Sequence, residues 1–277
     1  DYTWTSGPGS SSSDFYHRIK GSEWDPWEKQ LMRSSRCKMV AVRDKLTARG
    51  LKRHGVDVCY MGNPMMDELG NSLPMKNFEG YRRLLLLPGS RMPEAKFNFR
   101  RLIRAVDFID ISSPLAIFVA LSSMELLQDI KCIMHTQGYL VNEKIQGGVK
   151  CESSWKKKSA LVFVGVGKFS DWARDVEVGL ANAGTATEQL VGLGIPCVSM
   201  PGSGPQFKKS FAERQSRMLG GAVIPCDNDV DFALTVKSLL ENKGFRQKLI
   251  RVGVKRMGNQ GASESLVAYM VQKLFIW

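Results

Sequence analysis

Residues 182–201 constrain the fold of this 277-residue chain more than any other segment. They read NAGTATEQLVGLGIPCVSMP and predict a glycine turn, a short helix over 185–192 and a buried strand over 195–199. A helix that begins here points unpaired backbone N–H groups and its positive dipole end toward the turn, which suits a phosphate or diphosphate. An ordinary capped helix of an α/β domain fits the same residues, so a second motif is needed to separate the two interpretations.

The second motif is LLLLPGSR at residues 84–91. Four leucines followed by turn residues are typical of a buried parallel strand that ends in a loop. Arg91 follows this turn, and the spacing of apolar residues after Pro93 predicts an amphipathic helix over 93–109. Arg91 should therefore lie at the carboxyl end of a strand, where open α/β sheets bind ligands and where a guanidinium suits phosphate oxygens. A solvated charge is the simpler interpretation of a lone arginine in a turn.

The rest of the chain alternates strands with helices, a pattern that predicts a parallel sheet with right-handed crossovers. We predict further strands at 115–121, 160–164, 177–181 and 222–225, and further helices at 123–136, 170–175, 208–219, 229–241, 244–257 and 262–275. Residues between 136 and 160 read as a basic hydrophilic loop. Upstream, strands at 38–42 and 56–61 flank a helix at 43–54 and resemble the end of another βαβ unit.

Composition fits a globular core, with 43% hydrophobic and 24% charged residues, and the apolar runs are too short to cross a bilayer. Six cysteines without a CxxC pair argue against a zinc site or a disulfide framework and favour a reducing compartment. The three histidines show no metal-ligand spacing. We therefore expect no metal and no cofactor.

The formal net charge of +12 is the largest deviation in composition. Such a surface attracts anionic lipid headgroups, nucleotides, nucleic acid or an acidic protein, although a basic face kept for solubility accounts for it equally well. Specific nucleic-acid binding is disfavoured, because no helix-turn-helix, zinc-finger or aromatic RNA-binding pattern accompanies the charge. The basic residues cluster at 82–83, 100–104, 156–158, 208–209 and 251–256.

Three motifs together resemble the lipid-A-disaccharide synthase family, which are GT-B glycosyltransferases with a UDP-sugar donor, and most closely its related proteins in cyanobacteria and plastid-bearing organisms. They are LLPGSR with the following Glu94 and Asn98, GNPMMD at 62–67, and GTATEQL with the later GIP turn. The resemblance spans roughly residues 36 to 275. Two departures bear on ligand preference: Asn63 replaces a histidine of the family motif, and Ala183 replaces a serine.

The resemblance implies a GT-B-like α/β fold, with a parallel Rossmann-like C-terminal domain and a remnant of the N-terminal Rossmann-like domain. It divides the chain into a flexible aromatic segment (1–35), the end of the N-terminal domain with a linker (36–75), the nucleotide-sugar domain (76–260) and a helix that crosses back (261–277). The catalytic group is expected in the largely absent N-terminal part. The implied donor-binding residues are Ser90, Arg91, Gly184, Thr185, Thr187, Glu188 and Gln215, with Arg91 facing diphosphate and Glu188 facing ribose.

Two functions follow from these observations. The first is a hexosyltransferase that takes a UDP-sugar donor and a lipid acceptor, in the cytoplasm or the plastid stroma and peripheral to a membrane. The second is a non-catalytic GT-B-derived subunit or scaffold that uses its basic or aromatic surface in a larger assembly or on a membrane. Fold alone does not separate them.

Overall fold

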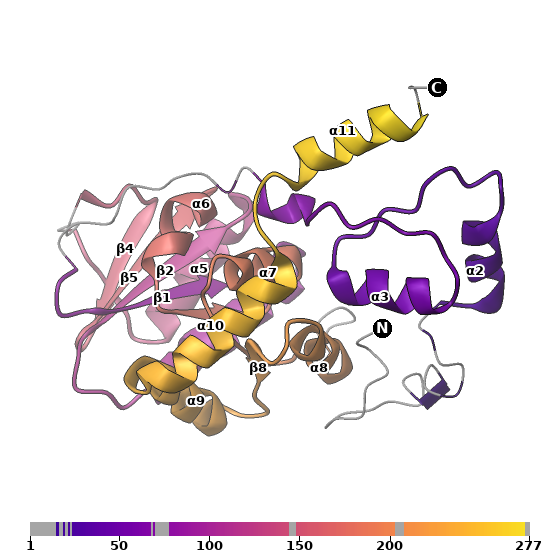
Figure 1. Ribbon diagram of the computed structural model, residues 1–277. Helices are drawn as coiled ribbons and strands as arrows, with labels where there is room; N and C mark the ends of the chain where they lie inside the picture. The colour runs from indigo at the N-terminus through magenta and orange to yellow at the C-terminus, as the bar shows by residue number, and fades with distance from the viewer. Residues whose placement is uncertain are drawn as a thin grey trace.

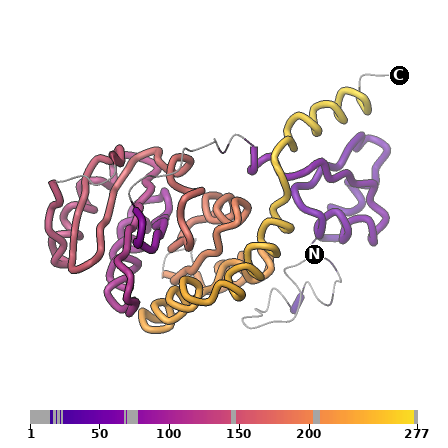
Figure 2. The backbone as a smooth tube through the Cα atoms, turned by 60° about the vertical axis from the view of Figure 1, so that its left-hand side comes forward, coloured from indigo at the N-terminus to yellow at the C-terminus, as the bar shows by residue number. Residues whose placement is uncertain are grey.

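The computed structural model describes residues 24–67, 78–143, 148–202 and 208–274, together with Phe15, Tyr16, Ile19, Ser22 and Leu69. Its main body is a sheet covered by helices, and a smaller unit built around α2 (Pro26–Arg33) and α3 (Lys45–Arg53) lies beside it (Figure 1). The tube view shows the same separation from another side (Figure 2).

The sheet has eight strands in the order β3-β4-β5-β2-β1-β6-β7-β8. All pairs from β5 to β8 are parallel, which confirms the parallel α/β fold predicted from the alternating pattern. The parallel strands are β1 (Arg82–Leu87), β2 (Leu115–Leu121), β5 (Ala160–Val166), β6 (Val178–Ala181), β7 (Cys197–Ser199) and β8 (Val223–Pro225).

The loop predicted between 136 and 160 is wrong, because β3 (Leu140–Val141) and β4 (Ser153–Lys157) pair there as an antiparallel edge. The lysines of this segment interrupt the apolar pattern from which β4 could have been predicted. The Trp155 side chain on β4 is 2% exposed, whereas the Lys157 ammonium forms an ion pair with Asp107 at 2.6 Å. Strand β4 lies next to the edge strand β3, and the ion pair with Asp107 compensates the charge of Lys157.

Strand β1 is buried on both faces, which is why it reads as an unbroken run of leucines. Leu84 and Leu86 pack in one hydrophobic cluster, and Leu85 and Leu87 in another. The first cluster lies under α4 (Glu94–Val106), α5 (Glu125–Thr136) and α9 (Asp229–Glu241). The second includes side chains of α6 (Phe169–Trp172), α7 (Thr185–Gly192) and α10 (Lys243–Met257). The two remaining elements of this body are η3 (Ala173–Asp175) and α8 (Lys209–Met218).

The N-terminal unit has its own small core, made by Ala48, Leu51, Val56 and Val58. The helix predicted at 43–54 is present as α3, but the strands predicted at 38–42 and 56–61 meet in a single parallel bridge between Ala41 and Cys59. Helix α2 was not predicted from the sequence. A capping box starts that helix, since the Asp25 N–H donates to the Glu28 carboxylate at 2.6 Å.

The last helix, α11 (Ala262–Leu274), contacts the segment around η1 (Pro64–Met66). The Asp67 carboxylate accepts from the N–H groups of Gly261, Ala262 and Ser263 at 2.7, 3.2 and 2.7 Å. Beyond its first turn the helix projects away from the main body (Figure 1). Three apolar residues of this helix, Leu266, Met270 and Leu274, are half-buried.

We predict that Asp67→Ala releases the start of α11. Hydrogen bonds from Ser263, its side chain first, lower the pKa of Asp67, so the ionised carboxylate stabilises the contact above its unfolded pKa of about 4 and loses it as pH falls through the lower folded pKa. Hydrogen exchange at pH 7 should accelerate at residues 261–265 and stay unchanged in β1. Asp57→Ala, an exposed carboxylate of the same unit, is the control. Unchanged exchange at 261–265 would contradict the anchor.

Candidate functional site

The order of the sheet reverses beside β1. The connection after β1 leads to β2 on one side, whereas β6, β7 and β8 follow one another on the other side. The loops after β1 and β6 therefore leave the sheet in opposite directions and open a crevice between them, which is where open α/β sheets bind ligands.

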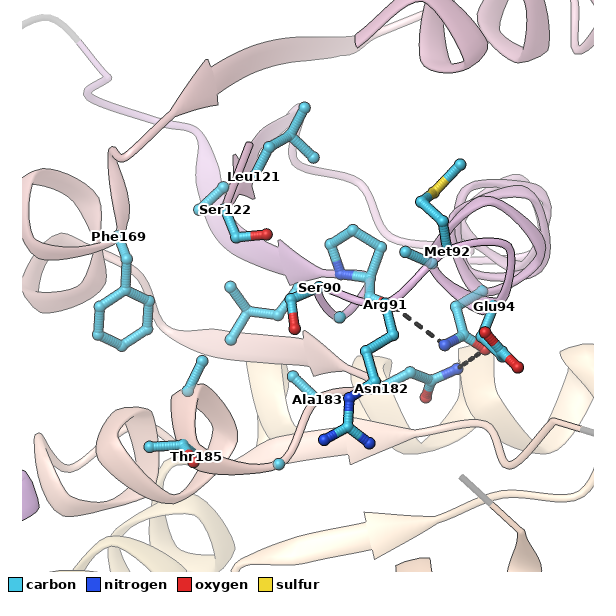
Figure 3. Close-up of a pocket in the computed structure, with 18 of the residues that line it drawn as sticks. Ser90, Arg91, Met92, Glu94, Leu121, Ser122, Phe169, Asn182, Ala183 and Thr185 are labelled. Carbon is cyan, nitrogen blue, oxygen red and sulfur yellow. Dashed lines mark hydrogen bonds between the residues drawn. The ribbon is translucent and has the colours of Figure 1, made fainter. Parts of the chain in front are cut away.

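A cavity of about 1110 Å³ occupies this crevice (Figure 3). Four loops line it, from the carboxyl ends of β1, β2, β5 and β6. Its walls include Ser90 and Arg91 after β1, Ser122 after β2, Gly167 and Phe169 after β5, and 182–186 after β6. The start of α8 closes one side with Lys208, Ser210 and Phe211.

Two buried asparagines fix these loops relative to one another. The Asn182 side chain accepts from the Met200 N–H at 2.9 Å and donates to the Met200 carbonyl at 2.8 Å and to the Asn98 side-chain oxygen at 3.3 Å. Asn98 in turn donates to the Pro88 carbonyl at 3.0 Å. Gly89, at φ +95°, fits between them because a Cβ there would lie 3.1 Å from the Asn182 carbonyl. The loops after β1, β6 and β7 therefore form one rigid rim.

The amino end of α7 forms the floor beside this rim. Gly184 and Thr185 line the cavity, and the N–H groups of residues 184–186 take no partner within the described part of the chain. Two predicted residues support this turn from behind. The Thr187 hydroxyl donates to the Ala183 carbonyl at 2.7 Å, and the Gln215 amide donates to the carbonyls of Ala183 and Gly184 at 3.3 and 3.2 Å.

Cations and aromatic rings give the cavity its chemical character. Arg91 and Lys208 bring positive charge to the lining, and Glu94 is the one carboxylate among its described residues. Figure 3 shows the Arg91 side chain extending across the loop at Asn182 and Ala183. Phe169 and Phe211 add apolar faces suited to a flat ring.

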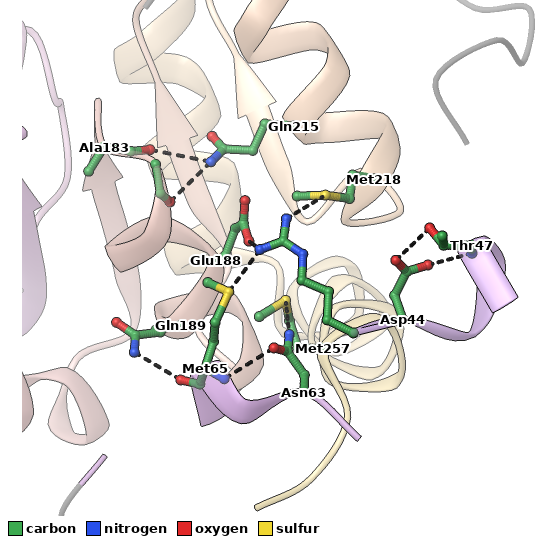
Figure 4. A network of polar contacts seen from close by, with 12 residues as sticks. Asp44, Thr47, Asn63, Met65, Ala183, Glu188, Gln189, Gln215, Met218 and Met257 are labelled. Carbon is green, nitrogen blue, oxygen red and sulfur yellow. Dashed lines mark hydrogen bonds and ion pairs between the residues drawn. The ribbon is translucent and has the colours of Figure 1, made fainter. Parts of the chain in front are cut away.

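Glu188 does not reach the cavity (Figure 4). Its carboxylate points toward the N-terminal unit and pairs with the Arg43 guanidinium at 3.2 Å. Burial raises the pKa of Glu188, the Arg43 charge opposes that rise and the nearby Asp44 adds to it. The structure thus brings Ser90, Arg91, Gly184 and Thr185 together, and leaves Thr187, Glu188 and Gln215 outside the lining.

Several residues of this site were not predicted from the sequence. Asn182 directly follows a buried strand, and a polar residue at that position is a signal that could have singled it out. Asn98 entered only as a motif residue. Phe169 and Lys208 carry no comparable signal, because their place in the cavity depends on how separate loops converge.

The described residues hold no group of three or more histidine, cysteine or acidic side chains placed to bind a metal ion. Within the same residues, no helix combines the length and apolar character needed to cross a membrane.

No family model matches the chain, and no curated protein matches it. Solved structures do resemble it. A protein described as UDP-N-acetylglucosamine 2-epimerase from Listeria monocytogenes superposes with a TM-score of 0.55 at 15% identity, over 83% of this chain and 57% of that one. The MnaA protein of S. aureus, solved with UDP, gives a TM-score of 0.55 at 13% identity, over 87% and 62%.

This chain has the Rossmann-like α/β fold of the GT-B class. At such low identity the likeness carries the fold and not the activity. The chain also spans only 57% and 62% of the lengths of these two proteins, so the activity of a whole GT-B enzyme does not transfer to it directly.

We predict that Asn182→Ala lowers the free energy of unfolding by about 1–3 kcal/mol, because it leaves the Met200 N–H and the Asn98 side-chain oxygen without their buried partner. Urea denaturation measures the loss. Ser122→Ala, an exposed residue of the same cavity, should change stability by less than about 0.5 kcal/mol. Equal stability of the two variants would show that the asparagine pair does not hold the rim.

Proposed function

We propose that the cavity binds the diphosphate of a UDP-sugar and that the chain carries the donor-binding half of a glycosyltransferase. The observation behind this is the convergence of Arg91 with the free N–H groups at the amino end of α7 in one cavity at the switch point of the sheet. Backbone donors and a guanidinium fork together match the oxygens of a diphosphate. The UDP bound to the similarly folded MnaA supports this choice of ligand.

The chemistry asked of such a site is electrostatic. When the bond between sugar and diphosphate breaks, negative charge grows on the departing diphosphate, and fixed donors that face it lower the barrier. Arg91 and the α7 N–H groups would receive this charge, and Lys208 would supply a second cation. Phe169 and Phe211 offer ring faces for the uracil. The acceptor, a lipid if the likeness to lipid-A-disaccharide synthases extends to the substrate, would approach from outside this domain.

Arg91→Ala should weaken UDP binding by about tenfold to a hundredfold, because it removes a charge-assisted contact worth about 1.5–3 kcal/mol. Isothermal titration with UDP, a UDP-sugar and inorganic diphosphate should show a similar loss for all three. Lys248→Gln, an exposed cation on α10, controls for the change in net charge. Undetectable UDP binding by the folded wild-type protein would contradict the donor site.

A second function is supported by one helix. Helix α3 places Lys45, Arg49, Lys52 and Arg53 at spacings that share a single exposed face, while Ala48 and Leu51 face the core of the N-terminal unit. These four cations pair with no carboxylate among the described residues. We propose that this face binds an anionic membrane surface, which gains about 1 kcal/mol per basic residue.

The same unit exposes apolar side chains suited to an interface. On α2, Trp27 and Leu31 are both 61% exposed and lie one turn apart. Tryptophan is enriched at the headgroup level of bilayers. The role is compatible with a glycosyltransferase that meets a lipid acceptor and with a non-catalytic membrane-bound subunit.

Replacing Lys45, Arg49, Lys52 and Arg53 by glutamine should lower binding to phosphatidylglycerol vesicles at least tenfold in co-sedimentation, because about 4 kcal/mol of attraction is at stake. The wild-type protein should bind phosphatidylcholine vesicles far less and release both at high salt. The matched control replaces four exposed cations of α10, Lys243, Lys248, Arg251 and Lys255, by glutamine. Equal losses in the two variants would show a response to net charge and not a binding face on α3.

A further inference from the structure

The proposed donor site leaves one buried carboxylate without a role. Glu188 is 8% exposed and lies in the first turn of α7, between Ala186 and Gln189, which both line the cavity. A carboxylate favours the start of a helix, since it faces the positive dipole end. At this position its charge also opposes any anion that binds to the same N–H groups, and burial weakens the screening between the two charges.

Arg43 supplies the compensating charge from the N-terminal unit. Its Nη1 lies 3.2 Å from Glu188 Oε2, and it is the one cation at ion-pair distance from that carboxylate among the described residues. The sulfur atoms of Met65 and Met218 flank the guanidinium at 2.9 and 3.9 Å. Asp44, the other acidic group nearby, is occupied by Thr47, whose N–H and hydroxyl donate to it at 2.8 and 2.7 Å.

Other contacts hold the two parts together without Arg43. The Gln189 amide donates to the Met65 carbonyl at 2.8 Å, and the Asn63 side-chain amide donates to the Met257 sulfur at 3.9 Å. Gly192 lets Met66 pack directly on α7, because a Cβ there would lie 2.4 Å from the Met66 sulfur. Removing the charge of Arg43 therefore leaves the packing of this junction in place.

We propose that Arg43 is a positioning residue of the anion site: it neutralises Glu188 and so keeps the amino end of α7 able to accept a diphosphate. The inference rests on the proposed donor site and extends it. The N-terminal unit then contributes to ligand affinity through charge, although none of its described residues lines the cavity.

Four proteins test this with inorganic diphosphate as the probe: the wild type, Arg43→Gln, Glu188→Gln and the double variant. Arg43→Gln should weaken diphosphate binding about tenfold in isothermal titration, because Glu188 is left as an uncompensated charge near the ligand. Glu188→Gln should bind diphosphate as tightly as the wild type or more tightly. The double variant should return to within about threefold of the wild type, since it restores neutrality. Lys248→Gln is the control for net charge.

The double variant separates charge compensation from a tethering role. If Arg43 served only to hold the N-terminal unit, the double variant would bind as weakly as Arg43→Gln, and the proposal would fail. Wild-type affinity in Arg43→Gln would overturn it as well. Absence of diphosphate binding in the wild type would overturn the donor site and this inference together, whereas the other failures leave the donor site intact. Thermal unfolding of each variant verifies that it is folded.

Discussion

Burial of β1 on both faces is the constraint on which the rest of this structure depends. A strand that packs helices on each side and pairs with parallel strands on each edge cannot shift without exposing four leucines. Its carboxyl end is therefore a fixed point, and the loop that leaves it must turn sharply. Gly89 makes that turn at positive φ, Asn98 donates to the Pro88 carbonyl of the same loop, and Asn182 donates to the Asn98 side-chain oxygen. The position of Arg91 follows from these contacts.

The parts of the fold that could be predicted are those whose pattern is local. The leucine run of β1 and the glycine turn before α7 each carry their own signal, so the parallel sheet and the amino end of α7 follow from short segments. Strand β4 was missed because lysines interrupt its apolar pattern, although Lys157 has a partner in Asp107. The bridge between Ala41 and Cys59 is too short to give a strand its usual periodicity.

The orientation of the Glu188 side chain could not be predicted from the neighbouring sequence. Its place in the first turn of α7 could be predicted, but the direction of its carboxylate depends on Arg43, which arrives from a distant part of the chain. Side chains one turn apart on a helix can point in several directions, and their tertiary contacts determine which direction they take. The same holds for Lys208 and Phe169, which reach the cavity only because separate loops meet there.

Helix α11 is anchored by its first turn, so a rotation at this anchor would swing the rest of the helix. Its 13 residues extend about 20 Å from the Asp67 anchor, at about 1.5 Å per residue. A rotation of about 10° at that pivot would move the far end by about 3 Å. Because Asp67 follows directly on η1, which packs on α7, the pivot is continuous with the floor of the cavity. A movement of α7 at the crevice would therefore reach α11 through η1 and Asp67.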